Sequence, residues 1–291
     1  MKVEARGCSY RYQHCLKGHE YALSGICLEV LPSQISGIVG VNGAGKSTLA
    51  NLLAGLSKPS EGTILADGKN IYASKTVLAA YRKAVALVPQ FPEDQFFTGS
   101  LYQELSFGLE RCGIDREIIH RKIGDTIREL GLNLDEESLV HRSPFELGGG
   151  EKRLISLAAA LIMEPKILIL DEPTAGLDIM ASQRIWNLIH GLRQRFKLSI
   201  IVISHEVEKL ALLVDRLIVV HQGKIACQGT PYEVFAKPTD LLSFGLELPQ
   251  ITVLGYNLEL LGIKPDHRPI FEVDEAAALI KKWFTGTMKA H

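Results

Sequence analysis

A run of glycines that ends in lysine and serine is the segment of this chain with the clearest chemical meaning. An apolar run at 34–39 predicts a buried strand before it, and residues 49–56 predict a helix after it. Strand, G-x-x-x-x-G-K-[ST] and helix, in this order, predict a phosphate-binding loop. The loop consists of Gly40, Val41, Asn42, Gly43, Ala44, Gly45, Lys46, Ser47 and Thr48.

The residue types of this loop suit a nucleoside triphosphate. Gly43 and Gly45 would let backbone N–H groups curl around a β-phosphate, and the next helix would direct its positive end toward it. Lys46 would reach the β- and γ-phosphates, and Ser47 would offer its hydroxyl to Mg²⁺. The alternative is a glycine-rich turn that binds no ligand, which the flanking strand and helix disfavour.

A pair of carboxylates predicts the catalytic centre. Residues 166–170 form a continuous apolar strand that ends in Asp171 and Glu172. A carboxylate at the C-terminal end of a parallel strand faces the crevice where ligands of open α/β sheets bind. We expect Asp171 to hold Mg²⁺ and Glu172 to act as the general base on the attacking water.

A histidine is expected at the same edge of the sheet. A helix is predicted over residues 179–196 and a buried strand over 198–204, which ends at His205. A right-handed crossover sets this strand parallel to the one before Asp171, so His205 would come within reach of a γ-phosphate. A lone histidine after a strand is usually structural. The neighbouring motifs favour the catalytic interpretation.

Composition narrows the class of protein. The 291 residues allow one large domain with an appendage, or two domains. The net charge of −1 gives no indication of a nucleic-acid partner. Five scattered cysteines without a C-x-x-C pair indicate a reduced, cytosolic protein, and the neighbours His14 and Cys15 do not by themselves make a metal site. We expect no signal peptide and no membrane-spanning segment.

Further motifs give the chain a family resemblance. Gln90 follows the apolar strand 84–88, Leu-Gly-Gly-Gly-Glu stands at 147–151, and Ala-Gly-Leu-Asp stands at 175–178. Together with the phosphate loop and His205, they resemble, in order, the motifs of an ATP-binding cassette (ABC) ATPase over nearly the whole chain. The resemblance implies the Q-loop glutamine, which senses Mg²⁺ and the transmembrane partner, the signature, the D-loop and the switch histidine.

The same resemblance assigns roles to single residues, with ATP and Mg²⁺ as cofactors. Tyr12 matches the aromatic residue that stacks on adenine, and Tyr10 and Tyr21 are weaker candidates because such tyrosines are often merely packed. The implied catalytic residues are Lys46, Glu172 and His205. The implied nucleotide contacts beyond the phosphate loop are Tyr12, Gln90, Gly148, Gly149, Gly150, Glu151 and Asp178. The implied metal contacts are Ser47, Gln90 and Asp171.

The signature departs from the family pattern. In this family two chains dimerise head to tail, and each signature contacts the ATP held by the opposite phosphate loop. Glycines that open a helix can bind an anion, although a flexible hinge is the alternative. Gly148 replaces the usual serine, Glu151 the glutamine and Leu154 an arginine. The lost serine hydroxyl favours a heterodimer with a paralogue, and a homodimer is the alternative.

Four segments are similar to energy-coupling factor (ECF) transporter ATPases: 90–97, 104–108, 163–168 and 244–252. The resemblance implies an ATPase on the cytoplasmic face of the membrane that drives import of a vitamin or a transition-metal ion. Its partners would be a transmembrane scaffold and a separate integral substrate-binding subunit. The alternatives are a weakly hydrolysing partner subunit and an ABC ATPase outside transport, although the long coiled coils and tandem cassettes of the latter are missing.

The expected fold is α/β, with a P-loop NTPase core. An antiparallel β layer over about 1–33 would pack on a core that includes 34–90 and 166–229, within an ATPase domain spanning 1–229. A helical arm would span about 91–165. The extension 230–291 would help to join the two ATPase chains.

Smaller features complete these expectations. A hairpin is predicted to turn at Gln222-Gly223. The helical pattern at 274–284 favours packing on its own domain over a membrane surface, because its polar face is not strongly basic. Phe96 and Phe97 are expected to anchor the transmembrane scaffold, with internal packing of both as the alternative.

Overall fold

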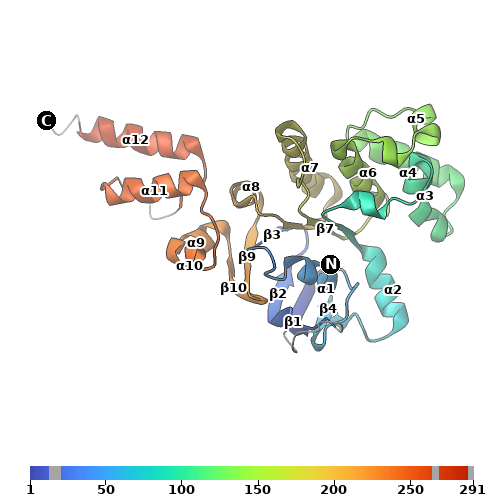
Figure 1. The fold of residues 1–291 in the computed structure, drawn as a ribbon, viewed down its shortest axis with the longest axis horizontal. Helices are drawn as coiled ribbons and strands as arrows, with labels where there is room; N and C mark the ends of the chain where they lie inside the picture. Colours follow the sequence, from blue (N-terminus) through green and yellow to red (C-terminus); the bar gives the residue numbers. More distant parts are fainter. Residues whose placement is uncertain (13–20, 264–268, 288–291) are drawn as a thin grey trace.

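The computed structural model describes residues 1–12, 21–263 and 269–287, which form two β-sheets and surrounding helices (Figure 1). The strands are β1 Val3–Tyr10, β2 Leu23–Val30, β3 Ile35–Val39, β4 Glu61–Ala66, β5 Lys69–Asn70, β6 Val85–Val88, β7 Ile167–Asp171, β8 Ser199–Ile203, β9 Arg216–His221 and β10 Lys224–Gly229. The α-helices are α1 Lys46–Leu53, α2 Lys75–Ala84, α3 Leu101–Arg111, α4 Arg116–Glu129, α5 Glu136–His141, α6 Gly149–Leu161, α7 Ile179–Phe196, α8 Val207–Leu213, α9 Pro231–Phe235, α10 Pro238–Ser243, α11 Gln250–Leu260 and α12 Val273–Thr287. Short 3₁₀ helices are η1 Pro92–Gln95 and η2 Pro144–Glu146.

A six-stranded sheet positions the residues with predicted chemistry. Its order is β10-β9-β3-β8-β7-β6, and the five strands from β9 to β6 are parallel. Every residue of β3, β7 and β8 is buried, as expected for central parallel strands covered on both faces. Because β3, β8 and β7 are neighbours, the segments that follow them emerge side by side at one edge.

The edge of this sheet closes with the predicted hairpin. Strand β10 pairs antiparallel with β9, and the two turn residues, Gln222 and Gly223, have φ angles of 47° and 72°. Two successive positive φ angles are the geometry of a two-residue hairpin turn that follows the natural twist of the strands. The prediction of this hairpin is confirmed.

The antiparallel layer is larger than the sequence indicated. Its order is β2-β1-β4-β5, so residues 61–70 belong to it and not to the parallel core to which 34–90 was assigned. Strand β4 pairs with β1 through Ala5 and Ile64, and both side chains are buried in a cluster that includes Leu53 of α1. The six residues of β4 carried no signal in the sequence for the sheet that they join.

Four α-helices, α3 to α6, and the two 3₁₀ helices form the arm between β6 and β7, and α6 returns from it to the core. The apolar faces of α3, α4 and α6 share one buried cluster with β3, β7 and β8. Two arginines of α7 also tie α7 to the arm: Arg184 donates to the carbonyl of Gly131 at 2.7 Å, and Arg195 donates to that of Glu129 at 3.0 Å. Apolar packing and these hydrogen bonds together hold the arm on the core.

The last four helices extend beyond the β9–β10 hairpin, away from the arm (Figure 1). Thr230 caps α9, and Pro231 occupies its first turn, which is a favoured pair at a helix start. Helices α11 and α12 lie side by side. Tyr256 of α11 donates its hydroxyl to the carbonyl of Phe235 in α9. No helix in the described ranges is apolar over a length that would cross a bilayer.

Candidate nucleotide-binding and hydrolysis site

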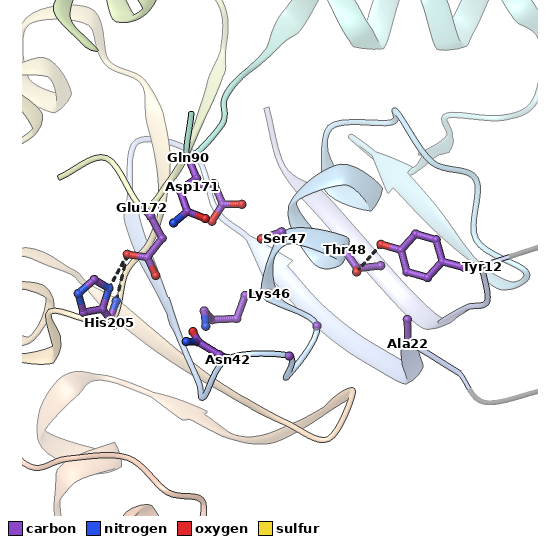
Figure 2. A pocket seen from close by; sticks show the side chains of 12 residues that line it. Tyr12, Ala22, Asn42, Lys46, Ser47, Thr48, Gln90, Asp171, Glu172 and His205 are labelled. Carbon is purple, nitrogen blue, oxygen red and sulfur yellow. Dashed lines mark hydrogen bonds and ion pairs between the residues drawn. The ribbon is translucent and has the colours of Figure 1, made fainter. Parts of the chain in front are cut away.

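A cleft of about 670 Å³ lies at the C-terminal edge of the parallel strands and brings together residues from distant parts of the sequence (Figure 2). The phosphate loop, the ends of the parallel strands and the N-terminal part of the chain all contribute residues to this cleft. The lining residues are Tyr12, Ala22, Asn42, Gly43, Gly45, Lys46, Ser47, Thr48, Gln90, Asp171, Glu172 and His205. This placement follows the rule that ligands of open α/β sheets bind beyond the carboxyl ends of the strands.

The phosphate loop needs glycine at its last turn. Gly45 has a φ angle of 105°, and a Cβ atom there would lie 2.7 Å from Leu23 Cδ2 and 2.9 Å from the carbonyl oxygen of Ala22. The ammonium of Lys46 crosses the loop and donates to the carbonyl oxygens of Gly40 at 2.8 Å and Val41 at 3.2 Å. The chain therefore holds a cation and the N-terminus of α1 next to each other, a combination that attracts phosphate.

Asp171 and Ser47 form the next part of the cleft. Asp171 ends β7, and only 7% of its surface is exposed. Burial raises the pKa of its carboxyl group above the ordinary value; the hydrogen bond from Ser47 and the charge of Lys46 oppose this rise, while the charge of Glu172 adds to it. A buried carboxylate beside a hydroxyl offers the oxygen ligands that Mg²⁺ prefers.

Glu172 adopts an unusual backbone conformation. Its φ angle is 49°, and its N–H donates to the carbonyl of Ile203 at 2.8 Å. Such a left-handed conformation is uncommon for a residue other than glycine and is found often at functional sites. It turns the carboxylate toward His205, whose Nδ1 lies 2.8 Å from Oε2 of Glu172 (Figure 2).

Behind this pair, Glu206 holds the histidine loop against its neighbours. Its carboxylate accepts hydrogen bonds from the hydroxyl of Thr174 and, at 3.4 Å, from Nε1 of Trp186. Sequence reasoning did not identify Glu206. Its position directly after His205 was the available signal, but its partners on α7 and after β7 become neighbours only in the folded chain.

The N-terminal tyrosines, among which the adenine contact was predicted, differ in their position relative to the cleft. Tyr12 is half exposed and shares a hydrogen bond of 2.8 Å with Thr48, while the ring of Tyr10 packs edge-on against that of Tyr12. Tyr21 instead lies under the guanidinium of Arg11, 3.8 Å from the ring centroid. Tyr12 is the one of the three tyrosines that lines the cleft. Alanine at position 22 also lines it and gave no signal, because its side chain carries no functional group.

The signature lies apart from the cleft of its own chain. Gly148 and Gly149 are exposed where α6 begins, and Glu151 folds back so that its Oε2 accepts from the N–H of Gly148 at 3.2 Å. Arg142 pairs with both carboxylate oxygens of Glu151, at 3.2 and 3.1 Å. Asp178 likewise stands outside the cleft lining, and its side chain caps α7 by accepting from Ala181 N–H at 2.8 Å.

The two phenylalanines after Gln90 differ in exposure. Phe96 is buried, and its ring packs edge-on against Phe145, so its expected role as an exposed anchor is wrong. Phe97 is 60% exposed and packs edge-on against Phe107, so the alternative of internal packing is wrong for this residue. Both residues directly follow the 3₁₀ helix η1 Pro92–Gln95. His14 and Cys15 lie outside the described residues.

The two sheets, the phosphate loop on α1 and the carboxylates after β7 define a P-loop ATPase. A model of the ABC transporter family matches residues 23–175. The energy-coupling factor transporter ATP-binding protein EcfA2 of Caldanaerobacter subterraneus subsp. tengcongensis is 37% identical over 99% of each chain. The EcfA2 of Bacillus subtilis is 38% identical over 86% of this chain and 90% of its own.

A solved structure agrees with these sequence relatives. The cbiO1 protein of Clostridium perfringens, described as part of the ABC transporter complex cbiONQ, superposes with a TM-score of 0.72 at 32% identity, over 88% of this chain and 98% of its own. The chain belongs to the ABC transporter family, in the group of ECF transporter ATP-binding proteins. The family resemblance and the α/β fold predicted from the sequence are confirmed.

Proposed function

We propose that this chain is the energy-coupling subunit of an ECF-type importer, which hydrolyses ATP to drive uptake of a vitamin or a transition-metal ion. The observation that carries the proposal is the convergence of Lys46, Glu172 and His205 on one cleft. These residues come from three separate strand ends, in a chain whose relatives carry the ECF name over nearly full length.

In the proposed reaction Lys46 neutralises charge on the β- and γ-phosphates. Glu172 accepts a proton from the attacking water, which its buried carboxylate can orient by a hydrogen bond. His205 is 69% exposed at its side chain, so it can hold Glu172 through Nδ1 and still face the γ-phosphate. The charge that develops on the phosphoryl oxygens thus meets donors that are already in place.

Mg²⁺ would be held by Ser47, Gln90 and Asp171 together with phosphate oxygens. The residues fit this ion, because a hydroxyl, an amide oxygen and a carboxylate are all hard oxygen donors. When bound, the ion would neutralise charge on the phosphates. Its positive charge would also favour the ionised form of Asp171, against the effect of burial on the pKa of that carboxyl group.

The exposed signature supports dimerisation of two ATPase chains, with Gly148–Gly150 of each chain against the nucleotide of the other. The carboxylate of Glu151 accepts hydrogen bonds from Arg142 and from the N–H of Gly148, so the conformation of the N-terminus of α6 is fixed before a partner chain binds. Because Gly148 lacks the usual hydroxyl, we favour a paralogue with a complete signature as the second chain. A weakly hydrolysing partner subunit is the alternative, because the signature lacks the serine hydroxyl. Glu172 and His205 in the cleft of this chain argue against a full loss of activity.

The transmembrane scaffold would dock where Gln90 leads from the cleft to an apolar surface. Phe91 and Phe97 are more than half exposed, and Phe107 is 38% exposed beside Phe97. The chain would sit on the cytoplasmic face of the membrane, and a separate integral subunit would bind the solute. The C-terminal helices α11 and α12 would contribute to the contact between ATPase chains, since Leu260, Trp283 and Phe284 leave apolar surface exposed there.

The experiment tests whether the chain assembles with an ECF scaffold and whether the complex then hydrolyses ATP. The tagged chain is co-expressed with an ECF scaffold, a substrate-binding subunit and a second ATPase chain, and the purified complex is assayed for ATP hydrolysis in liposomes. We expect all four proteins to co-purify and hydrolysis to be lost with Lys46→Ala. Failure of the wild-type chain to assemble with any ECF scaffold, or equal turnover with Lys46→Ala, would refute the proposed function.

A further inference from the structure

Arg153, one turn into the signature helix α6, connects two segments that flank the cleft although it does not itself line the cleft. Only 5% of its surface is exposed. Its Nη1 donates to the carbonyl oxygens of Pro89 at 3.1 Å and Gln90 at 2.8 Å, and its Nη2 donates to that of Ala175 at 3.2 Å. One guanidinium group therefore fixes the backbone on both sides of the catalytic edge.

The two segments lead to different partners in the proposed function. The side chain of Gln90 lines the cleft, and the chain runs on from it to the exposed ring of Phe97. Ala175 stands between Glu172 and the loop that ends at Asp178, and its N–H donates to the carbonyl of Glu172 at 3.1 Å. A shift of Arg153 would therefore move the metal-side glutamine and the backbone beside the general base together.

The helix that carries Arg153 begins with the exposed glycines of the signature. The hydrogen bonds of a helix connect its successive turns, so a contact made at Gly148–Gly150 would displace Arg153, which is only a few residues further on. The hydrogen bonds from Nη1 and Nη2 offset part of the cost of burying the guanidinium, and bonds from a charged donor are stronger than neutral ones. Its planar fork presents donors on separate nitrogen atoms in fixed directions, whereas the donors of a lysine ammonium all lie on one nitrogen atom.

We propose that Arg153 is a positioning residue that transmits nucleotide contact at the signature to the Gln90 and Ala175 backbone, and so to the scaffold and to the general base. The inference rests on the proposed function and adds to it the residue that joins the three segments. It assigns the coupling to a buried side chain that does not line the cleft.

The experiment compares Arg153→Met with wild type in the complete complex of ATPase chains and transmembrane proteins. MgATP hydrolysis gives kcat and KM, and a fluorescent ATP analogue gives nucleotide affinity. Loss of hydrogen bonds from a buried charged donor should lower kcat by about tenfold or more. Nucleotide affinity should stay within about twofold, because the interaction acts on turnover and not on ground-state binding.

The matched control is Arg184→Met. Arg184 also ties the arm to the core, through the carbonyl of Gly131, but it is exposed and contacts neither flanking segment. Its kcat should remain within about twofold of wild type. An equal loss of kcat in both variants would assign the effect to general loosening of the arm and overturn the proposal.

The remaining outcomes distinguish failure of this proposal from failure of the proposed function. Wild-type kcat in a folded Arg153→Met complex would overturn the proposal while the proposed function stands. An inactive wild-type complex would instead refute the proposed function itself. If Arg153→Met does not fold, Arg153→Lys decides: it keeps the charge but not the fork, and we expect kcat to fall by about threefold or more with unchanged affinity. Wild-type turnover with Arg153→Lys would then overturn the proposal.

Discussion

At Glu172, a backbone conformation that few non-glycine residues adopt coincides with the role of general base that we propose for its side chain. The strand β7 fixes the preceding residue, and the carbonyl of Ile203 receives the Glu172 N–H from the neighbouring strand. The cost of the left-handed φ angle is therefore met by two strands of a buried sheet. The carboxylate reaches the cleft already oriented.

The substitution Glu172→Gln tests this role. The amide keeps the shape of the side chain but cannot accept a proton, so hydrolysis should slow by two or more orders of magnitude, about 3 kcal/mol or more at the barrier. ATP binding should remain nearly intact, and an ATP-dependent dimer should accumulate. Steady-state hydrolysis and size-exclusion chromatography with ATP measure the two effects.

Glu208→Gln is the matched control. Its carboxylate stands three residues beyond His205 but accepts from the N–H of Gln250, outside the cleft. Turnover near wild type is expected for this control. The same turnover in Glu172→Gln would remove Glu172 from the mechanism.

Substitution of Gly148 by serine should increase the rate of ATP hydrolysis. It has ordinary extended backbone angles, and a Cβ atom added there would meet only Oε2 of Glu151, at 3.9 Å, within the described structure. A serine therefore fits without strain. A restored hydrogen bond to a charged phosphate oxygen contributes roughly 1.5–3 kcal/mol, so Gly148→Ser should accelerate hydrolysis by about tenfold or more.

The comparison for Gly148→Ser is Gly124→Ser in α4, where an added Cβ atom also has open space around it. This control should leave the hydrolysis rate unchanged. No gain from Gly148→Ser in an otherwise active assembly would show that the missing hydroxyl is unimportant.

Which residues of the cleft could be predicted depended on how local their signals are. Lys46 and Ser47 belong to a motif that is complete within nine residues, and Asp171, Glu172 and His205 each follow an unbroken apolar strand. Their convergence followed from the parallel crossover. Glu206 and Arg153 gave no such signal, because their partners come from other elements and are set by tertiary packing.

At the scale of elements, two adjacent aromatic residues that follow the 3₁₀ helix η1 lie in different environments. Phe96 joins the buried cluster of the arm, while Phe97 and Phe107 pack edge-on at the surface. Apolar residue type alone could not distinguish the two, because no periodic pattern extends through so short a turn.

Phe97→Ala should weaken the complex with the transmembrane scaffold. Removal of an exposed aromatic anchor from an interface costs on the order of 1–2 kcal/mol, so affinity for the scaffold should fall by about tenfold. ATP affinity should not change, because Phe97 does not line the cleft. Quantitative pull-down in detergent and nucleotide titration provide the two readouts.

Leu56→Ala is the control for this surface, since Leu56 is similarly exposed at 56% but follows α1 at another part of the molecule. Equal scaffold affinity for Phe97→Ala and wild type would contradict the docking surface. A loss with both variants would indicate a general effect of apolar truncation.

Elements with a long, regular pattern were the most predictable. Helix α7 spans the predicted residues 179–196, and the strands β3 and β8 lie within their predicted runs. The sheet partner of β4 could not be predicted, because a strand of six residues can pair with either sheet and its partner β1 is distant in the sequence.

At the scale of the whole molecule, the two surfaces with which one chain would contact ATP differ. The cleft has its full set of side chains, whereas the exposed signature lacks the serine hydroxyl. In a homodimer both ATP sites would face Gly148. In a heterodimer with a paralogue that carries the serine, the site built on Lys46 and Glu172 of this chain would have the complete set of donors. The working particle would then have one fast and one slow site.

Mixing tests this asymmetry. The chain alone should hydrolyse ATP slowly. Addition of the paralogue should raise the hydrolysis rate of the wild type by a larger factor than it raises the rate of Gly148→Ser, each compared with the same chain alone. The reason is that the variant already regains part of the lost hydrogen bonding. Titration of one chain into the other, with hydrolysis measured per total chain, gives the ratio. Full activity of the homodimer without any gain on mixing would contradict the asymmetric particle.

The hydrogen bond between Trp186 and Glu206 gives the chain an optical reporter of its own. The sequence has two tryptophans; Trp186 is 5% exposed and touches the residue next to His205, whereas Trp283 is 40% exposed on α12. Indole emission depends on the polarity around the ring, so the two should fluoresce at different wavelengths. Trp283→Phe leaves a single tryptophan near His205, through which movement of that loop can be followed in the unlabelled protein as nucleotide binds.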